Sequence, residues 1–305
     1  MRLIIGCVIG GLAWMTSAAS AAPRQADADN LKLFVGQILG PMQYTRNYKN
    51  PQELNRTAAW ITEQMRLFSI PCQYQNFNLN QKQYRNVICR LNAGHPDKVV
   101  IGAHYDVEGE SRGVNHNASG VAGVIEAAHL LSQSKNSLKN NVEFVFYTLA
   151  TVPYLNTEHM GSIRHAKSLV NAPEPVNAIY VLDQIGFYDS DFVQEYPVGL
   201  KWLYPNHANF IAVVSNIASR DLASQYCQNM QKIDQLACER FSLPFNVFED
   251  SDHLSYWKYD LPAVLITDTG QYRNKNQYRT EVELKRLDYK KMAAVVDGVV
   301  SSITQ

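Results

Sequence analysis

The sequence has no excess of charge of either sign. Its 305 residues contain 28 basic and 28 acidic side chains. Proteins whose main partner is nucleic acid or an anionic membrane surface usually carry a strong positive charge, so we expect neither partner here. The sequence also lacks a P-loop, a dinucleotide-binding glycine fingerprint and a G-x-S-x-G nucleophile elbow. These absences argue against a nucleotide-dependent enzyme and against a serine hydrolase of that type.

Long apolar runs are absent except at the N-terminus. Arg2 supplies a basic start, residues 3–15 form an apolar stretch too short to span a bilayer comfortably, and residues 19–21 are small. We predict a cleaved signal peptide over 1–21 and a single exported domain over 22–305, periplasmic or extracellular. An uncleaved membrane anchor is the alternative. No later run is long enough for a membrane helix, so we expect no membrane contact after cleavage.

Cysteine is scarce, and its count is informative. Cys7 would leave with the signal peptide, so the mature chain keeps Cys72, Cys89, Cys227 and Cys238. An even number in an oxidising compartment predicts disulfides. The first pair would face each other across a hairpin, and the second would close a short local loop. Four free buried thiols are the alternative; none of the spacings is that of a zinc knuckle.

Strand-like and helix-like segments alternate along most of the chain. We expect strands over 99–103, 142–149, 178–182, 210–214 and 263–267, and a hairpin from 72–77 and 84–91. We expect helices over 29–39, 53–68, 120–131, 159–169, 220–232 and 287–303. This alternation predicts the α/β class, with a mixed, largely parallel central sheet and helices on both faces.

Side chains that bind metals stand at or near the ends of these strands. His104 and Asp106 follow one strand, and Asp183 follows another. Binding sites of α/β sheets form at the carboxyl ends of strands, and a carboxylate two residues after a histidine can fix its ring. His116 and His253 could complete a site of zinc-ligand type. Glu108 and Glu110 follow in the loop after His104, where we expect them to be solvated, although that loop could bring them to a metal.

Four motifs occur in the same order as in a known enzyme family. They are HYD at 104–106, G-x-x-x-NASG at 113–120, PY-x-x-TEHMGS at 153–162 and SDH at 251–253. Over residues 86–268 the sequence resembles the co-catalytic di-zinc aminopeptidases of metallopeptidase clan MH. The resemblance implies a zinc-aminopeptidase-like fold with two zinc ions that share a bridging carboxylate. It implies that His104 and Asp183 bind one zinc ion, that Asp106 orients His104, and that His253 binds the other zinc ion.

Three catalytic positions of that family are not matched. Immediately before Asn117, where the family has an Asp pair that includes the bridge, this sequence has Asn115-His116. Where the family has a Glu pair, counting back from Pro153 gives Thr151-Val152, so that Thr151 occupies the position of the general base. A slip of one residue changes nothing, because residues 144–156 contain no Asp, Glu or His. Neither replacement side chain can accept a proton from the attacking water at neutral pH.

The loss of carboxylates limits the metal content. A neutral imidazole has one free lone pair, so His116 cannot bridge two metals without becoming an imidazolate. We therefore expect at most one zinc ion, held by His104, His116 and Asp183, with room for water or substrate. His253 would have little to help it hold a second ion.

The leading hypothesis is a secreted, catalytically degenerate member of the family, a pseudoenzyme with little or no peptidase activity. Its partners would be peptide N-termini or another protein. Two alternatives stay open. One is a single-zinc hydrolase or transferase with altered chemistry that uses His116 as the base. The other is an active metal-dependent aminopeptidase whose missing acids come from elsewhere in the chain.

Overall fold

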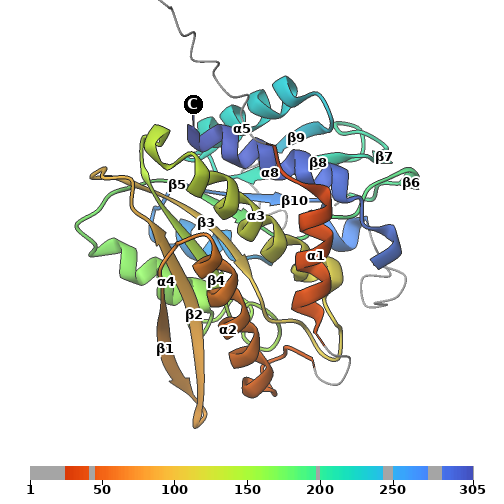
Figure 1. Ribbon diagram of the computed structural model, residues 1–305. Coiled ribbons are helices and arrows are strands. Elements are labelled where there is room, and N and C mark those ends of the chain that lie inside the picture. The colour runs from red at the N-terminus through yellow and green to blue at the C-terminus, as the bar shows by residue number, and fades with distance from the viewer. Residues whose placement is uncertain (1–24, 41–44, 197–199, 243–249, 274–283, 305) are drawn as a thin grey trace, which may run out of the picture.

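An eight-stranded sheet forms the centre of the molecule (Figure 1). The computed structural model describes residues 25–40, 45–196, 200–242, 250–273 and 284–304. The strands of the sheet are β1 (Cys72–Leu79), β2 (Lys82–Leu91), β3 (Lys98–His104), β4 (Asn141–Tyr147), β5 (Val176–Leu182), β8 (Phe210–Ser215), β9 (Ala237–Phe241) and β10 (Ala263–Thr267). A separate two-stranded sheet pairs β6 (Asp189–Val193) with β7 (His207–Ala208).

Across the large sheet the strands run in the order β1-β2-β4-β3-β5-β10-β8-β9. Neighbours are parallel in the β3–β4, β3–β5, β5–β10 and β8–β9 pairs, and antiparallel in the β1–β2, β2–β4 and β8–β10 pairs. The centre is parallel because helical crossovers connect its strands, whereas a tight turn joins β1 to β2. The predicted mixed, largely parallel sheet is confirmed.

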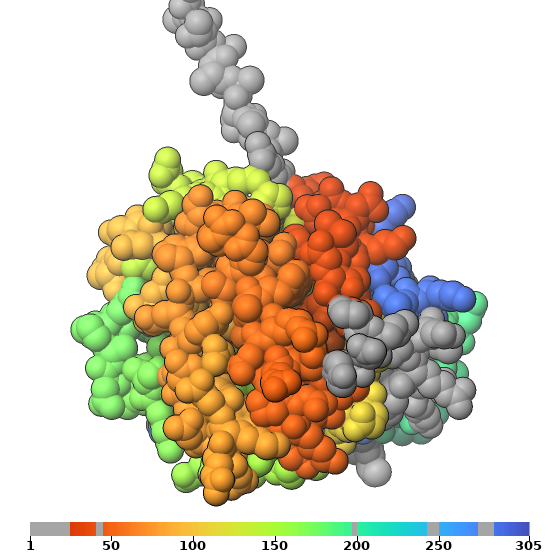
Figure 2. Space-filling view, turned by 60° about the horizontal axis from the view of Figure 1, so that its bottom comes forward, coloured from red at the N-terminus to blue at the C-terminus, as the bar shows by residue number. Residues whose placement is uncertain are grey.

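Helices cover both faces of this sheet, also as predicted (Figure 1). They are α1 (Ala28–Leu39), α2 (Pro51–Leu67), α3 (Gly120–Gln133), α4 (Gly161–Val170), α5 (Arg220–Ile233), α6 (His253–Trp257) and α8 (Tyr289–Thr304). The cores assign α1, α2, α3, α5 and α8 to one face and α4 and α6 to the other. Figure 2 shows the part of the surface where α2 lies beside the β1–β2 hairpin.

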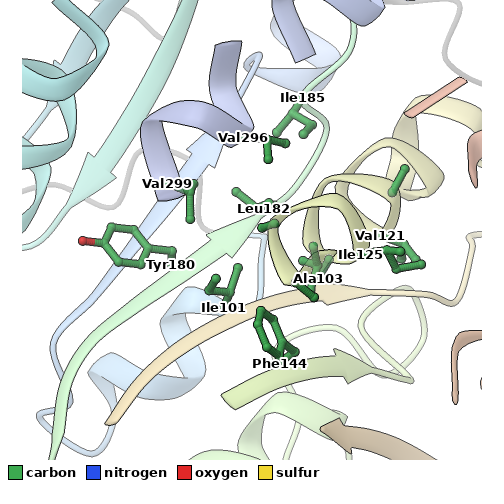
Figure 3. Close-up of a cluster of buried hydrophobic side chains, with 14 of the residues drawn as sticks. Ile101, Ala103, Val121, Ile125, Phe144, Tyr180, Leu182, Ile185, Val296 and Val299 are labelled. Carbon is green, nitrogen blue, oxygen red and sulfur yellow. The ribbon is translucent and has the colours of Figure 1, made fainter. Parts of the chain in front are cut away.

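Strand β3 shows how one segment serves two cores. Ile101 and Ala103 point to the core under α3 and α8, where they meet Val121 and Val296 (Figure 3). Val100, the residue before Ile101, faces the opposite core. Side chains alternate across a strand, so a central strand buried on both faces is apolar at nearly every position. Each such side chain, fully buried, contributes roughly 1.5–3 kcal/mol.

Both predicted disulfides are present. Cys72 and Cys89 are direct partners in the β1–β2 register, with Cα atoms 3.9 Å apart. Cys227 in α5 is bonded to Cys238 in β9, with Cα atoms 5.4 Å apart. The second bond thus fastens an edge strand to the helix before it. The sequence analysis did not predict β9, nor the short β6 and β7.

The predicted signal peptide, residues 1–21, lies outside the described residues. None of the helices in the described ranges has the length and apolar character that a membrane crossing requires.

Candidate metal centre

Three metal-binding side chains meet at the carboxyl ends of two neighbouring strands. His104 is the last residue of β3, and Asp183 follows directly after β5. His116 comes from η1 (Val114–Ser119), the irregular turn before α3. Asp183 Oδ1 lies 3.4 Å from His104 Nε2 and 3.8 Å from His116 Nε2. One ligand atom from each of the three residues lies within 4.8 Å of the others.

This set has the spacing and chemistry of a zinc site. Ligand atoms about 2.0–2.1 Å from a tetrahedral ion lie roughly 3.3 Å apart, close to the two distances above. Asp183 Oδ1 is buried and has no hydrogen-bond partner within the described part of the chain. A buried acceptor without a partner is costly, and a cation would supply one. Two imidazoles and one carboxylate, with a position left open, are also a ligand set that zinc accepts.

The ionisation of the three groups is strongly coupled. Burial opposes protonation of His104, but Asp183 and Asp106 outweigh it and raise the pKa of its ring well above the ordinary 6.5. Burial opposes ionisation of Asp183, yet His104 and His116 hold the pKa of its carboxyl well below its usual range. Burial lowers the pKa of His116 to about 4. The directions of these shifts favour an ion pair between His104 and Asp183 beside a neutral His116, and a metal ion bound at His104 would displace the proton of its ring.

The backbone, rather than a carboxylate, holds the His104 ring most closely. His104 Nδ1 lies 3.0 Å from the main-chain oxygen of Asp106 and 3.6 Å from the nearer oxygen of its side chain. The Nδ1–H donates to that carbonyl, which leaves Nε2 directed at Asp183. The Asp106 carboxylate instead accepts hydrogen bonds from the turn at 150–151. The family resemblance implied that Asp106 orients His104, and here its carbonyl makes the closer contact.

Ser251 positions Asp183, a role that the sequence analysis did not assign. Its hydroxyl donates a hydrogen bond of 2.7 Å to Asp183 Oδ2. The contact fixes the carboxylate with the other oxygen, Oδ1, toward the two histidines. Ser251 is the first residue of the SDH motif, so this motif could have identified it in the sequence.

The retained NASG motif joins η1 to the end of β5. Asn117 donates to the carbonyl of Leu182 at 2.8 Å and accepts from the main-chain N–H of Gln184 at 3.0 Å. Ser119 accepts from the N–H of Ile185 at 3.1 Å. These bonds hold the turn that carries His116 against the strand that carries Asp183.

Arg46 fixes the loop between the two histidine ligands. Its guanidinium, which is buried, donates to the carbonyls of Tyr105 at 3.0 Å, Arg112 at 2.9 Å and Gly113 at 3.3 Å. Burial and the nearby Arg112 lower the pKa of Arg46 to about 10, against the opposing effect of Asp106. No pattern around Arg46 marked it in the sequence, because its three partners are far away along the chain.

His253 does not join the three-residue set. It begins α6, is completely buried and packs edge-on against Trp257, with ring centroids 4.5 Å apart. Both of its ring nitrogens lack hydrogen-bond partners among the residues that the structure describes, and burial lowers its pKa to about 3. Asp252 beside it is equally buried, neither of its carboxylate oxygens has a hydrogen-bond partner in the described ranges, and burial raises its pKa to about 7. The structure thus brings together three of the four predicted metal ligands.

A cavity of about 100 Å³ opens onto the centre. Ala150 and Thr151 both line it, whereas the side chain of Val152 is 51% exposed and does not. The positions of the chain that face the metal centre are therefore 150 and 151. The carboxylates that line the described part of the cavity are Glu108, Asp183 and Asp250.

The family model of peptidase family M28 matches residues 86–302. The chain belongs to this family. A relative in Escherichia coli, the uncharacterized protein YfbL, is 34% identical over 297 residues, which cover 93% of this chain and 90% of that protein.

Solved structures share the M28 fold at low sequence identity. The LapA aminopeptidase of Legionella pneumophila aligns with a TM-score of 0.73 and 17% identity, over 91% of this chain and 71% of that one. A glutaminyl cyclase of Porphyromonas gingivalis gives 0.68 and 18%, over 91% and 98%. A Zn-dependent exopeptidase of Parabacteroides distasonis gives 0.67 and 14%, over 93% and 100%. The fold of this M28 member is therefore common to proteins named for different reactions.

Proposed function

We propose that this M28 protein is exported, binds one zinc ion through His104, His116 and Asp183, and captures peptide N-termini with little or no hydrolysis. The observation that carries the proposal is the pairing of a complete three-ligand set with two side chains, Ala150 and Thr151, that cannot act as a base. Both lie on the cavity wall beside the set. Membership of M28 and the zinc exopeptidase among the similar structures support zinc as the metal.

The residues present support binding better than turnover. Zinc, when bound, supplies a Lewis acid that polarises a carbonyl oxygen. His116 offers a neutral imidazole lone pair, and Ser251 keeps the Asp183 carboxylate in place. Hydrolysis also needs a group that takes a proton from the attacking water and passes it to the leaving amine, a contribution of about 10²–10⁴-fold. Positions 150 and 151 offer only a methyl group and a hydroxyl that is already hydrogen-bonded to Asp106.

Export is part of the proposal. The two disulfides are typical of an oxidising compartment. The N-terminal 21 residues have the composition of a signal peptide, and the mature domain would then begin at residue 22.

A single-zinc hydrolase or transferase is the second candidate, and Glu108 is the observation that favours it. This half-buried residue lies in the loop after β3 and lines the same cavity as His116 and Asp183. A carboxylate there is the kind of group that accepts protons in acid–base catalysis. Glutaminyl cyclases among the similar structures also agree with chemistry other than peptide hydrolysis.

The deciding experiment combines metal analysis with binding and turnover on the purified mature protein. We expect one equivalent of zinc, binding of a free-amine peptide but not of its N-acetylated form, and no turnover of an aminoacyl-substrate panel. His104→Ala should abolish both the zinc and the peptide binding. Chelator-sensitive release of N-terminal residues that is lost in His104→Ala would overturn the proposal. Turnover that is also lost in Glu108→Gln would support the second candidate.

A further inference from the structure

The hydroxyl of Thr151 points toward the carboxylate of Asp106. It donates to Asp106 Oδ2 at 2.9 Å and has the carbonyl of Val107 at 3.3 Å as a second neighbour. A hydroxyl has one proton to donate, and here Asp106 receives it. Thr151 itself is 5% exposed, although it lines the cavity.

Asp106 is a fully buried carboxylate that accepts four hydrogen bonds from one short turn. It accepts from the N–H of Ala150 at 3.1 Å to each oxygen, and from the N–H and hydroxyl of Thr151 at 3.3 and 2.9 Å. A buried carboxylate needs such donors to offset the loss of hydration. The Thr151 hydroxyl is the only side-chain donor among these four bonds and has the shortest distance.

Asp106 in turn holds the ring of His104. Its carbonyl accepts from His104 Nδ1 at 3.0 Å, so the placement of the Asp106 main chain sets the direction of Nε2. Groups that fix a metal-binding histidine through its other nitrogen typically change metal affinity by 10–100-fold when they are mutated.

We propose that Thr151 is a positioning residue: its hydroxyl anchors the Asp106 side chain and thereby holds His104 Nε2 toward Asp183 and the metal. The inference rests on the proposed function, in which His104 binds the zinc ion. Under this inference Thr151 has a structural role of its own, in addition to standing where the family resemblance implies a catalytic base. A glutamate at 151 could not take this role, because an ionised carboxylate has no proton to donate to Asp106.

The test compares Thr151→Val, which keeps the shape of the side chain but removes the hydroxyl, with Thr151→Ser, which keeps the hydroxyl. Thr57→Val is the matched control, since the Thr57 hydroxyl donates to the carbonyl of Glu53 inside α2, away from the candidate metal centre. Zinc affinity is measured by competition with a chelator, and the visible absorption of the cobalt-substituted protein reports ligand geometry. We expect Thr151→Val to weaken zinc binding about 10-fold or more and to change the cobalt spectrum. Thr151→Ser and Thr57→Val should stay within a few-fold of wild type.

A second readout does not depend on metal. The ¹⁵N chemical shifts of the His104 ring, assigned with His104→Ala and recorded at one pH in metal-free protein, should move in Thr151→Val and not in Thr151→Ser. Unchanged affinity, cobalt spectrum and ring shifts in Thr151→Val would overturn the inference. A wild type that binds no zinc while the ring shifts still move would refute the metal site and leave the positioning role standing. No zinc and no shift would refute both.

Discussion

At the scale of single residues, His116 sets this protein apart from a two-metal site. It stands where the family resemblance requires a bridging carboxylate, and its Nε2 lies 3.8 Å from Asp183. A carboxylate has two oxygens and a negative charge for two cations, whereas a neutral imidazole offers one lone pair. In the proposed function, a histidine at this position adds a ligand to one zinc ion and removes the link to a second. His253, with both nitrogens unpartnered in the described structure, is left apart from the set.

Replacing His104 by alanine should abolish tight zinc binding, because it removes one of three ligands and the nearer of the two histidines beside Asp183. His253→Ala should reduce zinc content much less, since His253 is not in the three-residue set. His207→Ala is the control, because that residue is exposed on β7. Inductively coupled plasma mass spectrometry after dialysis measures all four proteins. Two retained equivalents in wild type would contradict the single-ion prediction.

Rebuilding the lost carboxylates should depend on which positions face the cavity. The triple change His116→Asp, Ala150→Glu, Thr151→Glu directs all three carboxylates to it, whereas His116→Asp, Thr151→Glu, Val152→Glu places one at a half-exposed position. We expect the first variant to gain aminopeptidase turnover on the order of 10²-fold over the second. Thr151→Glu alone should gain little, because coupled catalytic groups do not act singly. Higher activity in the Val152→Glu variant would show that this region is arranged differently when substrate is bound.

At the scale of elements, the two disulfides connect different kinds of structure. Cys72–Cys89 joins strands that already share a ladder of eight residue pairs. Cys227–Cys238 joins α5 to β9, which has a neighbour in the large sheet on one side only. β1 is an edge strand too, but β9 is held to its neighbour β8 by five residue pairs only, against eight for β1 and β2. The strand with the shorter ladder opens more easily, so the second bond matters more for local order.

Changing both Cys227 and Cys238 to serine should lower the free energy of unfolding by about 2–4 kcal/mol, because the link no longer restricts the unfolded chain. Amide hydrogen exchange should rise over 237–241 more than elsewhere. The matched variant, Cys72→Ser with Cys89→Ser, should show a similar loss of stability but little change in exchange at β1, whose ladder remains. Equal local opening in the two variants would argue against this dependence on ladder length.

At the scale of the whole molecule, the opposite end of the sheet carries a buried polar network. Glu143 in β4 accepts from Lys98 at 3.2 Å, from Arg90 at 2.7 Å and pairs with His165 at 2.9 Å. His165 continues to the hydroxyl of Tyr256 in α6 at 2.8 Å. The network thus connects the sheet to α4 and α6, which lie on the same face of it. Burial opposes ionisation of Glu143, but His165, Lys98 and Arg90 lower the pKa of its carboxyl to about 2.

This depressed pKa predicts a loss of stability in acid. A carboxylate with an ordinary pKa of 4.5 and a folded value of about 2 stabilises the fold above pH 4.5, and this stabilisation is lost as the pH falls toward 2. The shift corresponds to about 3 kcal/mol. Glu143→Gln should therefore show a flatter dependence of unfolding free energy on pH over that range, measured by denaturant titration. Glu158→Gln, a change at an exposed carboxylate, should keep the wild-type slope; equal slopes in both variants and wild type would refute the prediction.

The sequence by itself determined the class of fold, the family and the disulfide pairs. Apolar alternation and the order of strand and helix segments are local properties, and motifs such as HYD, NASG and SDH are read directly from the chain. The tertiary structure decided which side chains meet. Only the pairing of β3 with β5 brings His104 to Asp183, and only the turn after β4 shows that position 150 faces the cavity and position 152 does not. Arg46 and Ser251 reach their partners across 59 and 68 residues of sequence. Contacts of that kind depend on how distant segments pack, and no local pattern encodes the final direction of a side chain.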